Sequence, residues 1–262
     1  MNPATLPEAG GLFKSIEKSI LQENAQDVIL FVPTLFLNSL LHLTTGKIHL
    51  GCQAVHPGPT GAMTGCVSCS MLKSLSSPSS LSSANQQKGE ITWCLTGHSE
   101  RRSLYNESDE EINLQLHCIL KNHMKSILCV GESHETYSKG SEEVKKFVRK
   151  QLSDCMKGIS KDDIMNGNLV IAYEPIWSIG VNGVPCPPET ANKILRFIRE
   201  EITNTFDKET GATCRIMYGG RVTGDNVDAL MNLQDIDGVL VGGGSLDAAV
   251  FERIINYKRG GV

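Results

Sequence analysis

The chain has 262 residues, a formal net charge of −4 and a pI near 6.0. This length accommodates one large α/β domain with a full hydrophobic core. No block of lysines and arginines is interleaved with aromatic residues, so the sequence lacks the footprint of a nucleic-acid-binding protein. No apolar run reaches the length of a membrane span, and the N-terminus has no secretion-signal pattern. We therefore expect a cytoplasmic protein without nucleic-acid or membrane partners.

Short apolar runs alternate along the chain with helical patterns. Each run is nearly continuous in Val, Ile and Leu, as expected for strands covered on both faces. The predicted strands span residues 28–32, 48–54, 92–96, 126–130, 169–173, 215–218 and 238–241. The predicted helices span residues 10–23, 35–43, 71–75, a segment opening at Ser108, 141–156, a segment beginning at Pro188, and 247–257. This repeat of strand, turn and helix predicts a parallel sheet with crossover helices.

Local signals predict where several of these elements begin. Pro33 ends the first strand, and Thr34 is placed to cap the helix that follows it. Ser108 with Glu111 forms a capping box, and Pro188 suits the first turn of its helix. Residues 76–88 are rich in serine and have no periodicity, so we expect them to form a flexible insertion.

Nine cysteines are scattered along the chain. Cys66 and Cys69 form one C-x-x-C, but no second pair stands at zinc-ligand spacing, so the motif is weak evidence for zinc. Cys52, Cys94 and Cys129 lie in apolar runs, where a free cysteine packs as a small hydrophobic residue. This usage indicates a reducing compartment.

Polar clusters follow the carboxyl ends of the strands. A (β/α) barrel and a doubly wound sheet both carry their active site there. No G-x-G-x-x-G follows an early strand, which argues against a dinucleotide-binding fold. The pattern alone does not separate an open sheet from a closed barrel. A barrel of this kind needs eight strands, whereas this chain begins with a helix.

Glu174 is the first candidate catalytic residue. It follows the strand at 169–173 and precedes Pro175, which has no N–H and ends the strand. A carboxylate in this place, followed by Pro-x-Trp and a glycine-rich loop, is typical of a general base beneath a lid. From this stretch alone, a surface glutamate in an ion pair is an equal alternative.

His98 lies in G-H-S-E-R-R (97–102), after the third strand. A neutral imidazole there can donate a hydrogen bond to a substrate carbonyl, and Glu100 strengthens that interpretation over a merely solvated or capping histidine. Glycines at 219–220 and 242–244 follow two late strands. Backbone amides in such turns hold phosphate, so the two runs together predict a phosphate site.

These motifs closely resemble the triosephosphate isomerase family. The resemblance rests on G-C-Q-A-V-H-P-G-P-T-G-A-M-T-G (51–65), T-G-H-S-E-R-R (96–102), E-S-D-E (107–110), C-V-G-E (129–132), A-Y-E-P-I-W-S-I-G (172–180), Y-G-G (218–220) and V-G-G (241–243). It runs from Pro33 to the C-terminus and is interrupted by the serine tract. It implies one (β/α)8 TIM-barrel domain over residues 1–262, lacking its first strand and carrying residues 76–88 as an insertion.

The resemblance also implies a reaction and its residues. The family interconverts dihydroxyacetone phosphate and glyceraldehyde 3-phosphate through an enediolate, in glycolysis and gluconeogenesis, without cofactor or metal. Glu174 would be the base, His98 the electrophile, and Glu100 and Cys129 their supporting groups. Substrate phosphate would meet Gly180, Gly220, Arg221, Gly242 and Gly243. The lid would comprise Pro175, Ile176, Trp177, Ser178, Ile179 and Val181, with Tyr218 opposite. The loop around Met63, Thr64 and Gly65 would reach a partner subunit, which implies a homodimer.

The sequence departs from its family at four places. The family's Asn-x-Lys after the first strand is missing: Ala4 stands two residues after Asn2, and Lys14 lies on the first helix. Losing an electrostatic partner of the transition state costs about 100-fold or more in rate.

The other three departures lie in and near the loops. Arg221 replaces a small hydroxyl residue that donates to phosphate, and it can bind phosphate or turn to solvent. Pro185 removes a backbone donor where the lid ends, which weakens closure. Cys66 stands where glutamate is usual. We therefore expect reduced activity, and the second hypothesis is a catalytically impaired isoform or pseudoenzyme that binds phosphate or a partner, or an incorrect gene model.

Overall fold

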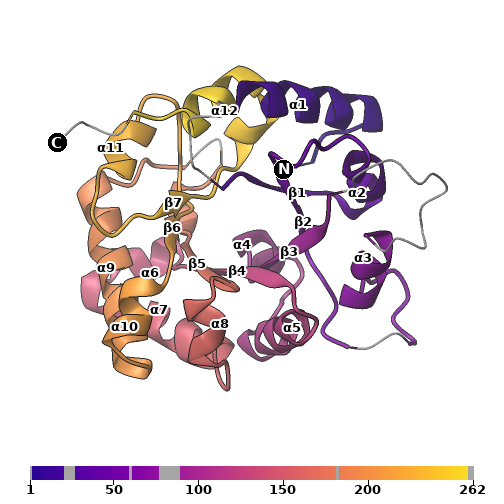
Figure 1. Cartoon of the computed structure of the whole chain (residues 1–262). Coiled ribbons are helices and arrows are strands. Elements are labelled where there is room, and N and C mark those ends of the chain that lie inside the picture. Colours follow the sequence, from indigo (N-terminus) through magenta and orange to yellow (C-terminus); the bar gives the residue numbers. More distant parts are fainter. Residues whose placement is uncertain (1, 21–26, 59–60, 77–88, 181–182, 259–262) are drawn as a thin grey trace.

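The computed structural model describes residues 2–20, 27–58, 61–76, 89–180 and 183–258. Val181 and residues 77–88 of the serine tract lie outside the described residues. The described strands form one parallel sheet in chain order: β1 (Ile29–Val32), β2 (His49–Cys52), β3 (Ile91–Thr96), β4 (Lys125–Val130), β5 (Leu169–Tyr173), β6 (Ile216–Tyr218) and β7 (Gly238–Val239). Figure 1 shows the sheet curving round the centre of the molecule with the helices on its outer side. This is the α/β TIM-barrel architecture that the sequence predicts, with a helix before its first strand.

The α-helices of the described chain are α1 (Leu6–Ser19), α2 (Thr34–Leu41), α3 (Cys69–Leu75), α4 (Ser99–Leu104), α5 (Asp109–Lys121), α6 (His134–Ser138), α7 (Ser141–Cys155), α8 (Lys161–Met165), α9 (Pro188–Thr205), α10 (Lys208–Thr213), α11 (Val227–Met231) and α12 (Ala248–Ile255). Two 3-10 turns, η2 (Ile176–Ser178) and η3 (Gly243–Leu246), follow β5 and β7. Both turns lie at carboxyl ends of strands, which is the side where sequence reasoning places the site.

Strand residues alternate between two cores because successive side chains point to opposite faces of a strand. The inner face contributes a small cluster that includes Trp93, Leu95, Ile127 and Val170, packed with Phe31 of β1. This cluster fills the centre of the curved sheet. The structure therefore has a packed interior, not a pore.

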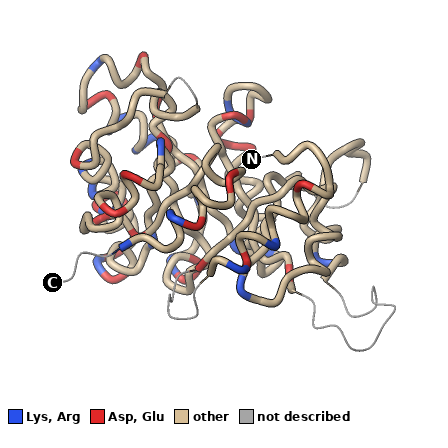
Figure 2. The backbone as a smooth tube through the Cα atoms, turned by 90° about the horizontal axis from the view of Figure 1, so that it is seen from above, with Lys and Arg blue, Asp and Glu red and all other residues tan. Residues whose placement is uncertain are grey.

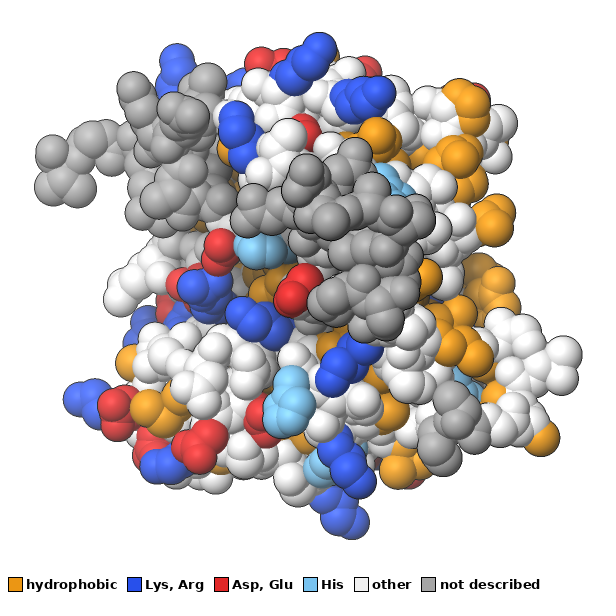
Figure 3. All heavy atoms as spheres, turned by 45° about the vertical axis from the view of Figure 1, so that its right-hand side comes forward, with side chains coloured by type: hydrophobic (Ala, Val, Ile, Leu, Met, Phe, Trp, Pro, Cys, Tyr) orange, Lys and Arg blue, Asp and Glu red, His pale blue; other side chains and the backbone are white. Residues whose placement is uncertain are grey.

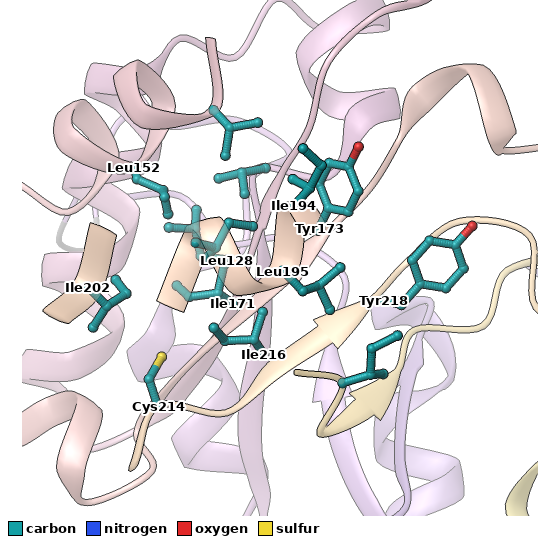
Figure 4. Packing of buried hydrophobic residues seen from close by; sticks show 14 of the residues in the cluster. Leu128, Leu152, Ile171, Tyr173, Ile194, Leu195, Ile202, Cys214, Ile216 and Tyr218 are labelled. Carbon is teal, nitrogen blue, oxygen red and sulfur yellow. The ribbon is translucent and has the colours of Figure 1, made fainter. Parts of the chain in front are cut away.

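The other strand face packs against the helices. Figure 4 shows Leu128, Ile171 and Ile216 of three neighbouring strands beside Ile194 and Leu195 of α9. All five are nearly or fully buried. A fully buried Leu or Ile contributes about 1.5–3 kcal/mol relative to leaving it exposed. This apolar layer fixes the strand ends that carry the site.

The strands β1 and β7 form the two edges of the sheet within the described chain. The helices bring the edges together, since α1 and α12 lie side by side in Figure 1 and the Asn256 amide donates to the Ser19 carbonyl at 3.0 Å. At the amino ends of the strands as well, Arg215 and Asp27 form an ion pair at 2.7 Å. Within the described chain, the gap between β1 and β7 is thus spanned by helix packing and side chains rather than by backbone pairing.

Two local predictions at helix starts are wrong. The first helix starts at Leu6, four residues before the predicted position, because Thr5 and Glu8 form a capping box. Thr34 does not cap α2: Pro33 occupies the N-cap position without a side-chain hydrogen bond. The Thr34 hydroxyl instead lies 3.3 Å from the Cys52 sulfur.

Charged residues of both signs are mixed along the described chain, as Figure 2 shows. On the face in Figure 3, basic and acidic side chains lie among polar and hydrophobic ones. Among the helices that the structure describes, none is both long enough and apolar enough to cross a membrane.

Candidate active site

Glu174 and His98 face each other at the carboxyl ends of β5 and β3. The His98 Nε2 lies 3.2 Å from Glu174 Oε1, and the Ser99 amide donates to Glu174 Oε2 at 3.0 Å. The glutamate is only 3 % exposed. Burial raises its pKa above the ordinary value of 4.5, although His98 and the Ser99 amide oppose that shift. Two residues 76 positions apart in sequence therefore form one acid–base pair.

A backbone hydrogen bond determines which ring nitrogen of His98 carries the proton and can donate to this carboxylate. His98 is the N-cap of α4, and its Nδ1 accepts from the Glu100 amide at 3.3 Å. A nitrogen that accepts an N–H carries no proton, so the ring proton of the neutral imidazole is on Nε2. That nitrogen can donate to the carboxylate here, or to a carbonyl oxygen that takes the carboxylate's place.

Two glycines allow the backbone to approach Glu174 closely. A Cβ on Gly131 would lie 1.8 Å from the Glu174 carbonyl oxygen, and a Cβ on Gly219 would lie 2.9 Å from the Glu174 Cγ. Both positions therefore exclude larger residues. Cys129 of β4 is fully buried beside them and hydrogen bonds to Glu174, and burial raises the pKa of its thiol. Cys129 thus touches the candidate base.

Arg102 supports this end of the sheet, and sequence reasoning assigned it no role. Its guanidinium donates to Asp109 Oδ1 at 2.6 Å, to the Gly97 carbonyl at 2.7 Å and to the Cys129 carbonyl at 3.2 Å. The side chain is 14 % exposed. It therefore ties the loop that carries His98 to β4. The only sequence signal was its place in G-H-S-E-R-R.

Glu132 anchors the start of the lid and was also missed. It is fully buried, and its Oε1 accepts from Trp177 Nε1 at 2.7 Å and from the Tyr173 hydroxyl at 3.1 Å. Trp177 also stacks on Tyr137, with ring centroids 4.1 Å apart. Burial raises the pKa of Glu132. The C-V-G-E motif contained this residue, but only the fold brings it under Trp177.

The near half of the lid meets β6 through Ser178. Its hydroxyl lies 3.5 Å from the Tyr218 hydroxyl, and it accepts from the Cys186 amide at 3.2 Å. Pro185 directly precedes Cys186 and has no backbone N–H to donate. Burial raises the pKa of Tyr218 well above its ordinary value. In this conformation the tyrosine contacts the near half of the lid.

The predicted phosphate glycines lie in loops after β5, β6 and β7. A Cβ on Gly180, Gly242 or Gly243 would meet no atom within 4 Å, so these three border open space. Gly220 is tighter, since a Cβ there would lie 2.1 Å from the Tyr218 hydroxyl oxygen. The Arg221 guanidinium donates to the Gly183 carbonyl at 3.4 Å. Arg221 thus lies against the lid loop.

The start of the chain lies near the same end of the sheet. Asn2 accepts a hydrogen bond at 2.9 Å from Gln53, which follows β2. A cavity of about 360 Å³ adjoins it, lined by Asn2, Pro3, Ala4, Glu8, Leu12 and Leu246. None of these lining residues is basic. Leu246 belongs to η3, so the cavity borders the glycine loop without supplying a cation to it.

Other predicted residues lie farther from the Glu174 carboxylate. The Glu100 carboxylate is 69 % exposed, and its oxygen lies 3.8 Å from His98 Nδ1, the side away from Glu174. The loop containing Thr64 is exposed, with Met63 44 % exposed and Gly65 at φ +83°. Ile179 continues the lid beyond η2. Within the described ranges, no group of three or more His, Cys, Asp or Glu side chains is arranged to hold a metal ion.

Comparisons with known proteins agree with this architecture. The sequence profile described as "Triosephosphate isomerase" matches residues 1–258. A protein named triosephosphate isomerase from Finegoldia magna is 38 % identical over 217 residues, covering 83 % of this chain and 79 % of its own. Those of Caldanaerobacter subterraneus subsp. tengcongensis and Thermoanaerobacter pseudethanolicus are each 35 % identical, over 91 % and 97 % of this chain and 89 % and 94 % of theirs. The chain belongs to the triosephosphate isomerase family.

Proposed function

We propose that this protein interconverts dihydroxyacetone phosphate and glyceraldehyde 3-phosphate, with Glu174 as base and His98 as electrophile. The observation that carries the proposal is the 3.2 Å approach of His98 Nε2 to the buried Glu174 carboxylate at the carboxyl ends of the strands. Membership of the family supplies the substrate class. An acid–base pair of this kind is suited to moving a proton next to a carbonyl.

Substrate binding changes the partners of both residues. In the structure Glu174 Oε1 faces His98 and Oε2 accepts from Ser99, so both carboxylate oxygens are engaged. A substrate carbonyl that accepts from His98 Nε2 frees Oε1 to take the proton from the neighbouring carbon. The same carboxylate then returns the proton to the other carbon of the enediolate. Closure of the lid from Pro175 to Ile179 shields this intermediate from water.

A catalytically impaired relative is the competing function. The observation that favours it is the absence of a basic residue from the lining of the cavity between the start of the chain and η3. A coupled isomerase assay on the 262-residue chain, combined with titration of inorganic phosphate, separates the two. Turnover within about 100-fold of an ordinary family member supports the isomerase. Phosphate binding without turnover supports the impaired relative.

The pH dependence follows from the raised pKa of Glu174. The base must be ionised to accept a proton, so activity is lost as pH falls through the pKa of the folded protein. We expect that midpoint to lie above 4.5, because burial disfavours the charged form. An NMR titration of isotope-labelled glutamate carboxyls measures it, and the Glu174→Gln variant assigns the signal. A midpoint at or below 4.5 would contradict the proposed environment.

Arg221 is proposed to contribute to phosphate binding. It follows β6 and lies against the lid loop, where its guanidinium can reach a phosphate with two parallel hydrogen bonds. We expect Arg221→Met to raise KM about 10-fold with a smaller change in kcat, since a charge-assisted hydrogen bond is worth about 1.5 kcal/mol. Arg215→Met, at the other end of β6, is the matched control. Equal KM values for the two variants would assign Arg221 to solvent.

We also propose a cytoplasmic homodimer and a single domain over residues 1–262. The loop at Met63, Thr64 and Gly65 is the contact by analogy with the family, and its exposure in the single chain supports that assignment. Light scattering on the purified chain, together with a variant that shortens this loop, tests the oligomeric state.

A further inference from the structure

A group of cysteines lies outside the candidate active site, where four elements meet. Cys52 ends β2, Cys69 begins α3, Cys94 lies on β3 and Cys118 lies on α5. The first three are fully or almost fully buried, and Cys118 is half-buried. Their thiols influence one another electrostatically. No part of the proposed isomerase chemistry uses them.

Cys69 and Cys118 lie close together in this group. Their sulfurs are 3.8 Å apart, and the Cys118 thiol donates to the Cys69 sulfur. A disulfide needs the sulfurs at about 2.05 Å, so each side chain has to move by about 1 Å. Rotation about χ1 can supply a movement of this size. The pair is therefore close enough to bond while both helices stay in place.

The surroundings give the two sulfurs different chemistry. Hydrogen bonds from Cys94 and Cys118 and the charge of Lys73 lower the pKa of Cys69 to about 7, against the opposing effect of burial. Burial raises the pKa of Cys118 to about 11. At neutral pH, about half of Cys69 is thus the thiolate, the reactive form, beside a thiol that keeps its proton.

We propose that Cys69 and Cys118 are a peroxide-sensitive dithiol that closes to a disulfide between α3 and α5. The Cys69 thiolate attacks hydrogen peroxide, which breaks the O–O bond, releases hydroxide and leaves a sulfenic acid. The Cys118 sulfur then attacks the Cys69 sulfur, its proton leaves with the hydroxyl group as water, and the S–S bond forms. Peroxide accepts the two electrons that the thiols lose.

The cross-link would join residues 49 positions apart in the chain. A bond across a segment of this length restricts the unfolded chain and so raises the melting temperature. It would also fix the start of α3, which follows the exposed loop at residues 61–66. Oxidation would therefore stiffen the side of the molecule that carries this loop.

Intact mass spectrometry of the full chain tests the proposal. The protein is first treated with a small excess of peroxide and is then denatured in the presence of an alkylating agent, which blocks the remaining thiols. We expect the wild type to lose about 2 Da, the two thiol hydrogens, and two alkylation sites. Tryptic cleavage should then join the peptides at residues 48–73 and 103–121. The melting temperature should rise by about 5 °C. Reduction should reverse all of these changes.

Variants assign the sulfurs, because the peptide at residues 48–73 also contains Cys52 and Cys66. Cys69→Ser and Cys118→Ser should each abolish the joined peptide while keeping the melting temperature of the reduced wild type within about 3 °C. Cys66→Ser, which replaces an exposed thiol, is the matched control and should still give the joined peptide. Joined peptides in Cys69→Ser, their loss in Cys66→Ser, or a wild type that is only hydroxylated would each overturn the proposal.

Discussion

Replacing Glu174 with Gln should lower kcat by about 10³-fold, with a much smaller change in KM. The amide keeps the size of the side chain but cannot accept the substrate proton, and general-base catalysis typically contributes 10²–10⁴-fold. The single amide oxygen can still accept from one of the two groups, Ser99 or His98, that hold the carboxylate at 3.0 Å and 3.2 Å in the structure. A coupled assay in both reaction directions measures the loss.

The matched control for this variant is Glu142→Gln, at an exposed carboxylate on α7 with 83 % of its side chain accessible. It should change neither kcat nor KM. A Glu174→Gln protein that keeps the parent's kcat would show that another group moves the proton. If the parent has no measurable turnover, binding of inorganic phosphate is measured instead. Glu174→Gln should then bind phosphate with the same affinity as the parent.

Replacing Arg102 with Met should lower the free energy of unfolding by about 3–5 kcal/mol. Arg102 and Asp109 are 14 % and 17 % exposed, and removing Arg102 leaves a largely buried carboxylate with only the longer, 3.8 Å contact to Lys150. The Gly97 and Cys129 carbonyls lose their guanidinium donors as well. Urea unfolding followed by circular dichroism measures the change.

An exposed ion pair supplies the comparison for Arg102. Arg196 and Glu200 lie on α9 with 70 % and 57 % of their side chains accessible, so Arg196→Met should stay within about 0.5 kcal/mol of the parent. Similar unfolding free energies for both variants would mean that the Arg102 network does not stabilise the fold. A loss of His98 function in Arg102→Met would follow from the same contacts, since Arg102 holds the carbonyl of Gly97.

Local sequence signals determined the order and type of most elements. The strand at 169–173 matches β5, and the helix predicted to begin at Pro188 does so because proline suits the first turn. The capping box at Ser108 opens α5 as expected. These signals succeed because their interactions span four residues or fewer. Thr34 shows the limit, since its predicted cap competes with a contact to Cys52 on a neighbouring strand.

Glu174 and His98 could be found because each ends a buried strand, and parallel strands bring their carboxyl ends to one side. Glu132 could not be assigned a role, since its partner Trp177 lies 45 residues away and only the packing of β4 against β5 joins them. The same holds for Arg102 with Cys129, and for the thiols of Cys69 and Cys118.

The sequence by itself determined the periodicity of the elements, the strand-end motifs and the helix that precedes the first strand, because these are properties of consecutive residues. Only the tertiary structure decided how the sheet's edges are bridged, through Arg215 with Asp27 and α12 with α1. It also decided which polar groups are buried together. Such contacts depend on chain segments more than 180 residues apart, and burial exists only once those segments have packed.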